Sequence, residues 1–133
     1  MFFKFTLDTY FISYWDKNAA VSYLQWHAES ASQGHCARYV REAIQREGIS
    51  LMLTYSARNY GSSLICTGFY EVSDANPQKG DVVVIQAIMN HPDGHMAMYD
   101  GAIWISDFKQ QLGFYPGPAY RSARPSYKIY RHD

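Results

Sequence analysis

The sequence has no excess charge of either sign, few cysteines and no long apolar run. Twelve Lys and Arg residues balance twelve Asp and Glu residues, so the formal net charge at pH 7 is zero. Such a chain lacks the basic field that attracts nucleic acids, and we expect no nucleic-acid partner. No apolar stretch approaches the roughly 20 residues of a transmembrane helix, so we expect no membrane span.

The beginning of the chain also lacks the features of an export signal. Residues 1–10 are apolar, but they have no basic leading segment and they contain Asp8. This pattern makes a poor signal peptide, so we expect synthesis in the cytoplasm without one. A chain of 133 residues is long enough to form one hydrophobic core without disulfides or metal ions to stabilise it. We therefore interpret residues 1–133 as a single domain, in which residues 1–17 form a possible N-terminal arm.

Aromatic residues, by contrast, are abundant: they make up 17% of the chain and include twelve Tyr. This composition suits strands and a surface that binds peptide or sugar. Helical periodicity precedes strand-like alternation, which predicts an α+β fold with N-terminal helices packed on a small antiparallel sheet. The expected helices cover residues 18–28, 36–46 and 56–65, the expected strands 80–86, 94–99, 102–108 and 127–131, and an irregular aromatic loop covers 113–125.

Residues 32–48 place a cysteine at the start of an amphipathic helix. Apolar residues recur from Cys36 at helical spacing, and Gly48 follows the last turn as a stop signal. A thiol at a helix N-terminus meets unpaired N–H groups and the positive end of the helix dipole, and both favour the thiolate. A core cysteine is the alternative, and the helix alone favours it. A Cys36–Cys66 disulfide would exclude a catalytic thiol, although two thiols without an export signal are more often reduced.

A cysteine nucleophile needs a base, and the base needs a group that orients it. Among five histidines, His95 alone begins an alternating strand, which gives its side chain a fixed direction. Asp107, on the returning strand, is the expected orienting group. A three-residue turn at 100–102 would place His95 opposite Asp107, so the catalytic interpretation predicts this turn or a bulge. Otherwise His95 is a strand-end residue bonded to backbone, and Asp107 is a solvated charge.

The same region permits a metal site as an alternative. His91, Asp93 and His95 have a spacing that could ligate zinc on a loop. A zinc site needs a further ligand, for which the sequence offers no evident source. We therefore expect neither a metal nor a cofactor.

Three sequence blocks resemble the signature blocks of the NlpC- and CHAP-type papain-like amidases, in that family's order. More narrowly, the cysteine block, the block around Trp104 and the C-terminal tail are similar to peptidoglycan amidases of type VI secretion effectors and related phage enzymes. The resemblance covers residues 18–131. The three blocks are residues 34–40, 76–83 and 94–107, and the narrower matches are residues 32–44, 104–108 and 116–131.

The resemblance implies a papain-like fold and a thiol mechanism. Cys36 would attack a peptide carbonyl in a peptidoglycan stem or cross-link, His95 would carry the proton to the leaving amine, and Asp107 would fix the imidazole tautomer. The Cys36 N–H would bind the oxyanion, with a second group from residues 33–35. For Gln33 we prefer a plain turn role, and for the tail surface packing is an equal alternative. The residues that could contact substrate are Gln33, His35, Tyr115, Tyr120, Arg121 and Arg124.

The resemblance also predicts partners and place of action. The substrate would be a peptidoglycan peptide, and a cognate immunity protein would plug the Cys36 cleft. The enzyme would act in the periplasm of target bacteria or be secreted. Two alternatives stay open at this point: a non-catalytic module that binds wall peptides or glycans, with Cys36 in its core, and a thiol acyltransferase on the same fold.

Overall fold

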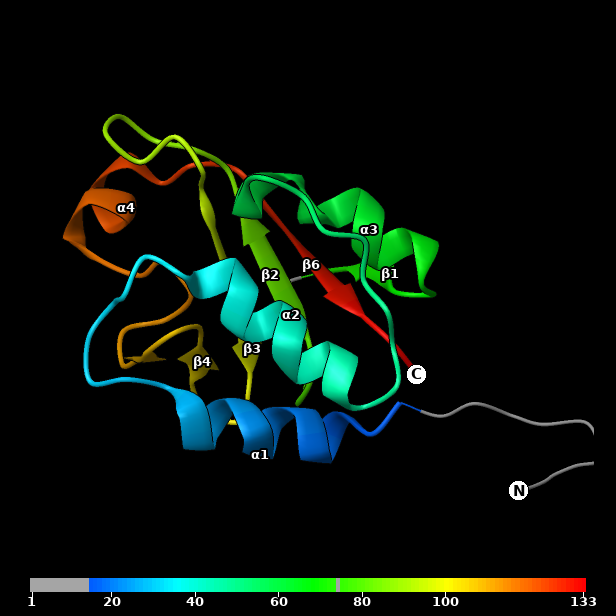
Figure 1. Cartoon of the computed structure of the whole chain (residues 1–133). Helices are drawn as coiled ribbons and strands as arrows, with labels where there is room; N and C mark the ends of the chain where they lie inside the picture. Colours follow the sequence, from blue (N-terminus) through cyan, green and yellow to red (C-terminus); the bar gives the residue numbers. More distant parts are fainter. Residues whose placement is uncertain (1–14, 74) are drawn as a thin grey trace, which may run out of the picture.

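A single antiparallel sheet organises the part of the chain that the structure, a computed structural model, describes, namely residues 15–73 and 75–133 (Figure 1). The predicted arm at residues 1–17 lies mostly outside these residues. The strand order is β1-β6-β2-β3-β4-β5, so the C-terminal strand lies beside β2 near the middle of the sheet. The strands are β1 (Tyr70–Val72), β2 (Val82–Ile85), β3 (His95–Tyr99), β4 (Trp104–Ile105), β5 (Lys109–Gln110) and β6 (Tyr127–Arg131).

All the described helices except the last, α4, cover one face of this sheet. Asp16 caps the first helix by accepting a hydrogen bond from the Ala19 N–H at 3.0 Å, so this helix begins one residue earlier than expected. The second helix buries Val40, Ala43 and Ile44 at the predicted spacing, and they pack on the sheet through Met96 and Met98. The helices are α1 (Lys17–His27), α2 (Cys36–Arg46), the 3-10 turn η1 (Ala57–Asn59), α3 (Tyr60–Cys66) and α4 (Pro118–Ala123).

The opposite face is covered by the aromatic segment that the sequence predicts as an irregular loop. Part of this segment is helical: α4 starts at Pro118, whose fixed φ suits a first helical position, and ends at Arg124 with φ 51°. Tyr120 on α4 packs with Trp104, Ile85 and other residues of this sheet face. The helix therefore carries the tail back over the sheet. Together the two layers confirm the α+β class.

The prediction of a three-residue turn between β3 and β4 is wrong. Tyr99 pairs with Trp104, so the connection is the four residues 100–103 rather than three. The Asp100 carboxylate stabilises it by accepting the Ala102 and Ile103 N–H groups, each at 2.7 Å. β4 then ends at Ile105, and the chain turns back into β5. Asp107 therefore lies in a turn and not in a strand opposite His95.

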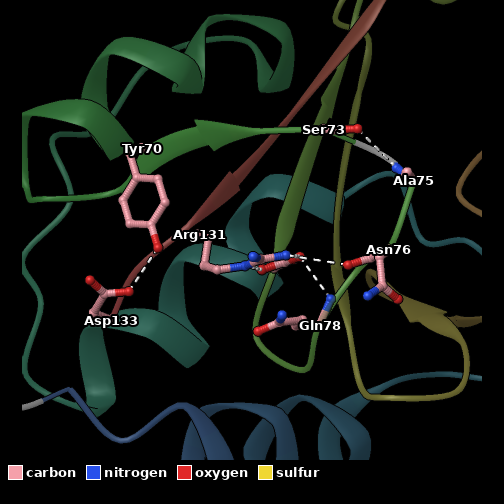
Figure 2. A network of polar contacts seen from close by, with 8 residues as sticks. Tyr70, Ser73, Ala75, Asn76, Gln78, Arg131 and Asp133 are labelled. Carbon is pink, nitrogen blue, oxygen red and sulfur yellow. Dashed lines mark hydrogen bonds and ion pairs between the residues drawn. The ribbon is translucent and has the colours of Figure 1, made fainter.

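A buried ion pair fixes the sheet at the end where β2 begins. Asp81, which is 0% exposed, accepts two hydrogen bonds at 2.8 Å from the Arg131 guanidinium. Arg131 also donates to the Asn76 carbonyl, and the Gln78 N–H donates to Asp81 at 2.8 Å (Figure 2). This bidentate pair ties β6 to the turn before β2. None of the described helices is long and apolar enough to cross a membrane.

Candidate active site

Cys36 and His95 line one cavity of about 570 Å³ at the end of the sheet where β3 begins. Cys36 comes from the first residue of α2 and His95 from the first residue of β3. The tail closes the other side through Tyr120, whose ring centroid lies 6.1 Å from that of His95. The remaining lining residues are Ser32, Gly34, Asn90, His91, Pro92, Asp93, Gly94, Phe108, Pro116, Gly117, Pro118 and Ala119.

The Cys36 thiol is half-buried and neutral rather than the thiolate that its helix position predicts. Burial raises its pKa to about 11, and the Asp107 carboxylate adds to the rise. Hydrogen bonds from backbone N–H groups, that of Met96 foremost, oppose this rise in the pKa. The helix end therefore supplies donors, but desolvation outweighs them. The Met96 contact also places the sulfur against the start of β3.

His95 is buried, with 6% of its surface exposed, and its ring is held by Gln110 of β5. The His95 Nε2 lies 2.7 Å from the Gln110 Oε1. The Gln110 amide nitrogen donates to the carbonyls of Gly113 and Phe114, at 3.1 and 2.8 Å, so its oxygen is the atom that faces the imidazole. The imidazole therefore carries its proton on Nε2. Its Nδ1 is unprotonated and can accept a proton.

Burial also keeps the imidazole neutral. Desolvation lowers the pKa of His95 to about 4, against opposing effects of the Gln110 hydrogen bond and the Asp107 carboxylate. His95 is therefore an unprotonated base throughout the neutral range. A neutral thiol and a neutral imidazole share the cavity.

Asp107 hydrogen-bonds to the loop before α2 rather than to His95, contrary to our prediction. Asp107 is 0% exposed, and its Oδ2 accepts the N–H groups of Gln33 and His35 at 2.8 and 2.9 Å. Its Oδ1 accepts the Ser106 hydroxyl at 3.2 Å. The carboxylate thus holds the loop that leads into the Cys36 helix. Because the N–H groups of Gln33 and His35 are already bonded, they are not available for an oxyanion, contrary to our expectation.

Of the remaining residues expected to bind substrate, some line the cavities beside Cys36 and others do not. Tyr120 lines the 570 Å³ cavity, and His35 lines a smaller one that also contains Cys36. The Gln33 side chain instead donates to the Ala31 carbonyl at 2.8 Å, in the turn role that we preferred. Tyr115 and Arg121 line neither cavity: the Tyr115 hydroxyl donates to the Pro125 carbonyl, and Arg121 donates to the Tyr115 carbonyl. Arg124, at the end of α4, lines neither cavity.

Within residues 15–73 and 75–133, the geometry does not support the alternative zinc site or the Cys36–Cys66 disulfide. No three His, Cys, Asp or Glu side chains in these ranges converge on a common point. Asp93 is instead tied to the Ser56 hydroxyl at 2.7 Å. Cys36 and Cys66 are both free thiols, and Cys66 is exposed at the end of α3.

Sequence reasoning missed Gln110. It lies in the polar run Lys109-Gln110-Gln111, which does not distinguish one glutamine from the next. Only the pairing of Gln110 with Trp104 places its side chain on the sheet face that His95 shares. Alternation after the turn at 106–108 is the one signal that could have identified it.

Comparisons with known proteins give matches only among solved structures. No family model matches the chain, and no curated protein matches it. The chain is 53% identical to a chain of the crystal structure of the type VI native effector–immunity complex Tae3-Tai3 from Ralstonia pickettii, with a TM-score of 0.85; the match covers 90% of this chain and 100% of that one. For the selenomethionine form of that complex, the identity is 57%, the TM-score 0.82, and the coverage 85% and 99%.

Proposed function

Given that this chain belongs to the Tae3 family of type VI effectors, we propose that it is an antibacterial enzyme that hydrolyses amide bonds in the peptides of bacterial peptidoglycan. The proposed catalyst is a papain-like pair, Cys36 and His95. The observation that carries the proposal is the single cavity that both side chains line, with an unprotonated imidazole beside a thiol at a helix N-terminus.

The reaction starts from two neutral groups. The Cys36 thiol passes its proton to His95 Nδ1 as the sulfur attacks the peptide carbonyl carbon. The tetrahedral intermediate collapses by breaking the C–N bond, and the imidazolium returns the proton to the leaving amine. Water then attacks the thioester, His95 takes its proton, and the sulfur leaves as the thiol when that proton returns. The products are a free amine and a free carboxylate.

The surrounding residues have positioning roles in this mechanism. Gln110 keeps the proton on His95 Nε2, which leaves Nδ1 for the thiol. Asp107 fixes the entry loop and, through its negative charge, favours the imidazolium that forms during attack. The oxyanion is bound by the Cys36 N–H at the start of α2, where helix N–H groups lack intrahelical partners.

The proposal extends to delivery and to a protecting partner. The matched structures are type VI effector–immunity complexes. This supports a chain that is delivered by a type VI apparatus, acts in the periplasm of target bacteria, and is inhibited by a cognate immunity protein over the Cys36 cavity. Co-expression with neighbouring genes should relieve periplasmic toxicity; no relief by any of them would remove the immunity partner from the proposal.

The function is tested by incubating purified wild type with peptidoglycan sacculi and identifying the released fragments by mass. Wild type should release peptides with new amine and carboxyl ends, Cys36→Ala should release none, and Cys66→Ala is the matched control that should act like wild type. Toxicity unchanged by Cys36→Ala would favour the binding module instead. Transfer of the acyl group to an added amine, in place of a new carboxyl end, would favour an acyltransferase.

A further inference from the structure

A second cavity, of about 220 Å³, adjoins Cys36 without reaching His95. Cys36 belongs to both cavities, whereas His95 lines only the larger one. Most of its lining residues come from the first turns of α2 and from the chain that follows this helix. That chain runs back along α2 toward α3 (Figure 1). Its lining residues are Gly34, His35, Cys36, Ala37, Arg38, Arg41, Leu53, Thr54, Tyr55, Ala57, Tyr60 and Asp93.

Arg41 is the unusual member of this cavity. It is half-buried on α2, and its Nε is fully buried without a hydrogen-bond acceptor in the described part of the chain. Nor does its guanidinium form any other hydrogen bond or an ion pair with a residue in 15–73 or 75–133. Buried donors in folded proteins are nearly always satisfied, so such a group points to a ligand.

The charged side chains that line the smaller cavity give it a net positive charge. Asp93 is the only carboxylate among its lining residues, and one of its oxygens already accepts the Ser56 hydroxyl at 2.7 Å. Arg38 adds a second cation and leans over the Tyr39 ring, with its Cζ 5.7 Å from the ring centroid. Two arginine side chains and one partly engaged carboxylate therefore line this cavity. This balance suits an anionic ligand with planar acceptors, which Arg binds in bidentate fashion.

The position of His95 decides which half of a substrate enters the smaller cavity. Because His95 must hand its proton to the leaving amine, the amine half lies in the larger cavity, beside the imidazole. The acyl half, which is bonded to the Cys36 sulfur, is then assigned to the cavity that Cys36 lines and His95 does not. We infer that Arg41 binds a free carboxylate on the acyl half of the substrate peptide, and so selects the bond that is cut. This inference rests on the proposed amidase function.

The test uses synthetic stem peptides that carry the bond identified in the sacculus digest. Each is made in two forms that differ only in whether the free carboxylates of the acyl half are carboxylates or carboxamides. Wild type should prefer the carboxylate form, and Arg41→Met should lower kcat/KM for it about 10- to 100-fold, mainly through KM. For the carboxamide form Arg41→Met should act like wild type. Arg41→Lys, which keeps the charge but loses the planar fork, should fall between the two.

The matched control is Arg46→Met on the same helix, where the guanidinium instead lies over the Tyr23 ring at 4.9 Å. It removes the same charge outside both cavities and should leave both substrates unaffected. Equal cleavage of the two peptide forms by wild type, or an equal loss on both in Arg41→Met, would overturn the inference while leaving the amidase function intact. Failure of wild type to release anything from sacculi would instead overturn the proposed function and the inference with it.

Discussion

Two buried polar clusters lie at opposite ends of the β2–β3 pair, and they differ in how their groups are compensated. At one end Asp81 and Arg131 meet charge to charge in a bidentate pair. At the other end His95 meets the neutral amide of Gln110, and the Cys36 thiol is surrounded by apolar walls and backbone N–H groups. The first cluster is electrostatically complete, and the second is not.

This difference indicates that buried polar groups have a structural role in the first cluster and a chemical role in the second. In a compensated ion pair the two charges are engaged with each other, and the pair serves to hold strands together. A buried base with one ring nitrogen unprotonated, beside a thiol, retains the capacity to move a proton. The following predictions test this division of roles.

The largest effect on stability is expected from Asp81→Asn. It leaves the Arg131 guanidinium without its bidentate partner, and breaking a buried pair costs about 3 kcal/mol or more in the free energy of unfolding. Urea unfolding measures the loss. Glu71→Gln is the control, because the Lys128–Glu71 pair at 3.8 Å is exposed and should contribute nothing measurable. A large loss of kcat for Asp81→Asn in the folded protein would contradict a purely structural role.

Gln110→Ala should lower kcat about 10- to 100-fold, since the imidazole loses the acceptor that fixes its tautomer and direction. The proposed mechanism requires neutral His95, so in wild type kcat/KM should fall only as the pH drops toward its pKa of about 4. In Gln110→Glu a carboxylate favours the imidazolium and raises that pKa, which moves the acidic limb of the pH profile upward. Gln111→Ala, an exposed neighbour, should change neither quantity.

Asp107→Asn should act mainly through the loop before α2. One amide oxygen replaces a carboxylate that accepts two backbone N–H groups, so we expect a loss of about 1–3 kcal/mol in the free energy of unfolding and a moderate loss of kcat. Loss of the negative charge lowers the pKa of His95, which moves the acidic limb of kcat/KM further down. An unchanged free energy of unfolding would contradict the loop-holding role, and an upward shift of the limb would contradict the effect of the Asp107 charge on His95.

The smallest effect concerns the reactivity of the free thiol. With the pKa of Cys36 raised to about 11, its thiolate fraction at pH 7 is small, so alkylation by iodoacetamide should accelerate about tenfold per pH unit from pH 7 toward pH 10. The measurement is made in a Cys66→Ser background, which leaves one reactive sulfur. A rate that is already level at pH 7 would indicate a preformed thiolate–imidazolium pair.

The sequence determined the local elements and singled out the pair that we propose to react, Cys36 and His95. Helical spacing from Cys36 predicts α2, and β-branched residues and alternation predict β2, β3 and the closing strand at 127–131. These predictions succeed because each depends on the period with which one stretch of chain buries its apolar side. Three ordered blocks then carried the resemblance that the solved structures confirm at the level of the type VI effector.

Only the tertiary structure decided which polar groups surround that pair. A connection one residue longer than expected places Asp107 in a turn and lets β5 return with Gln110 beside His95. The neutral state of the Cys36 thiol also follows from packing, because desolvation by distant segments outweighs the field of its own helix. Loop length and burial depend on contacts between residues far apart in the chain, and local periodicity carries no information about them.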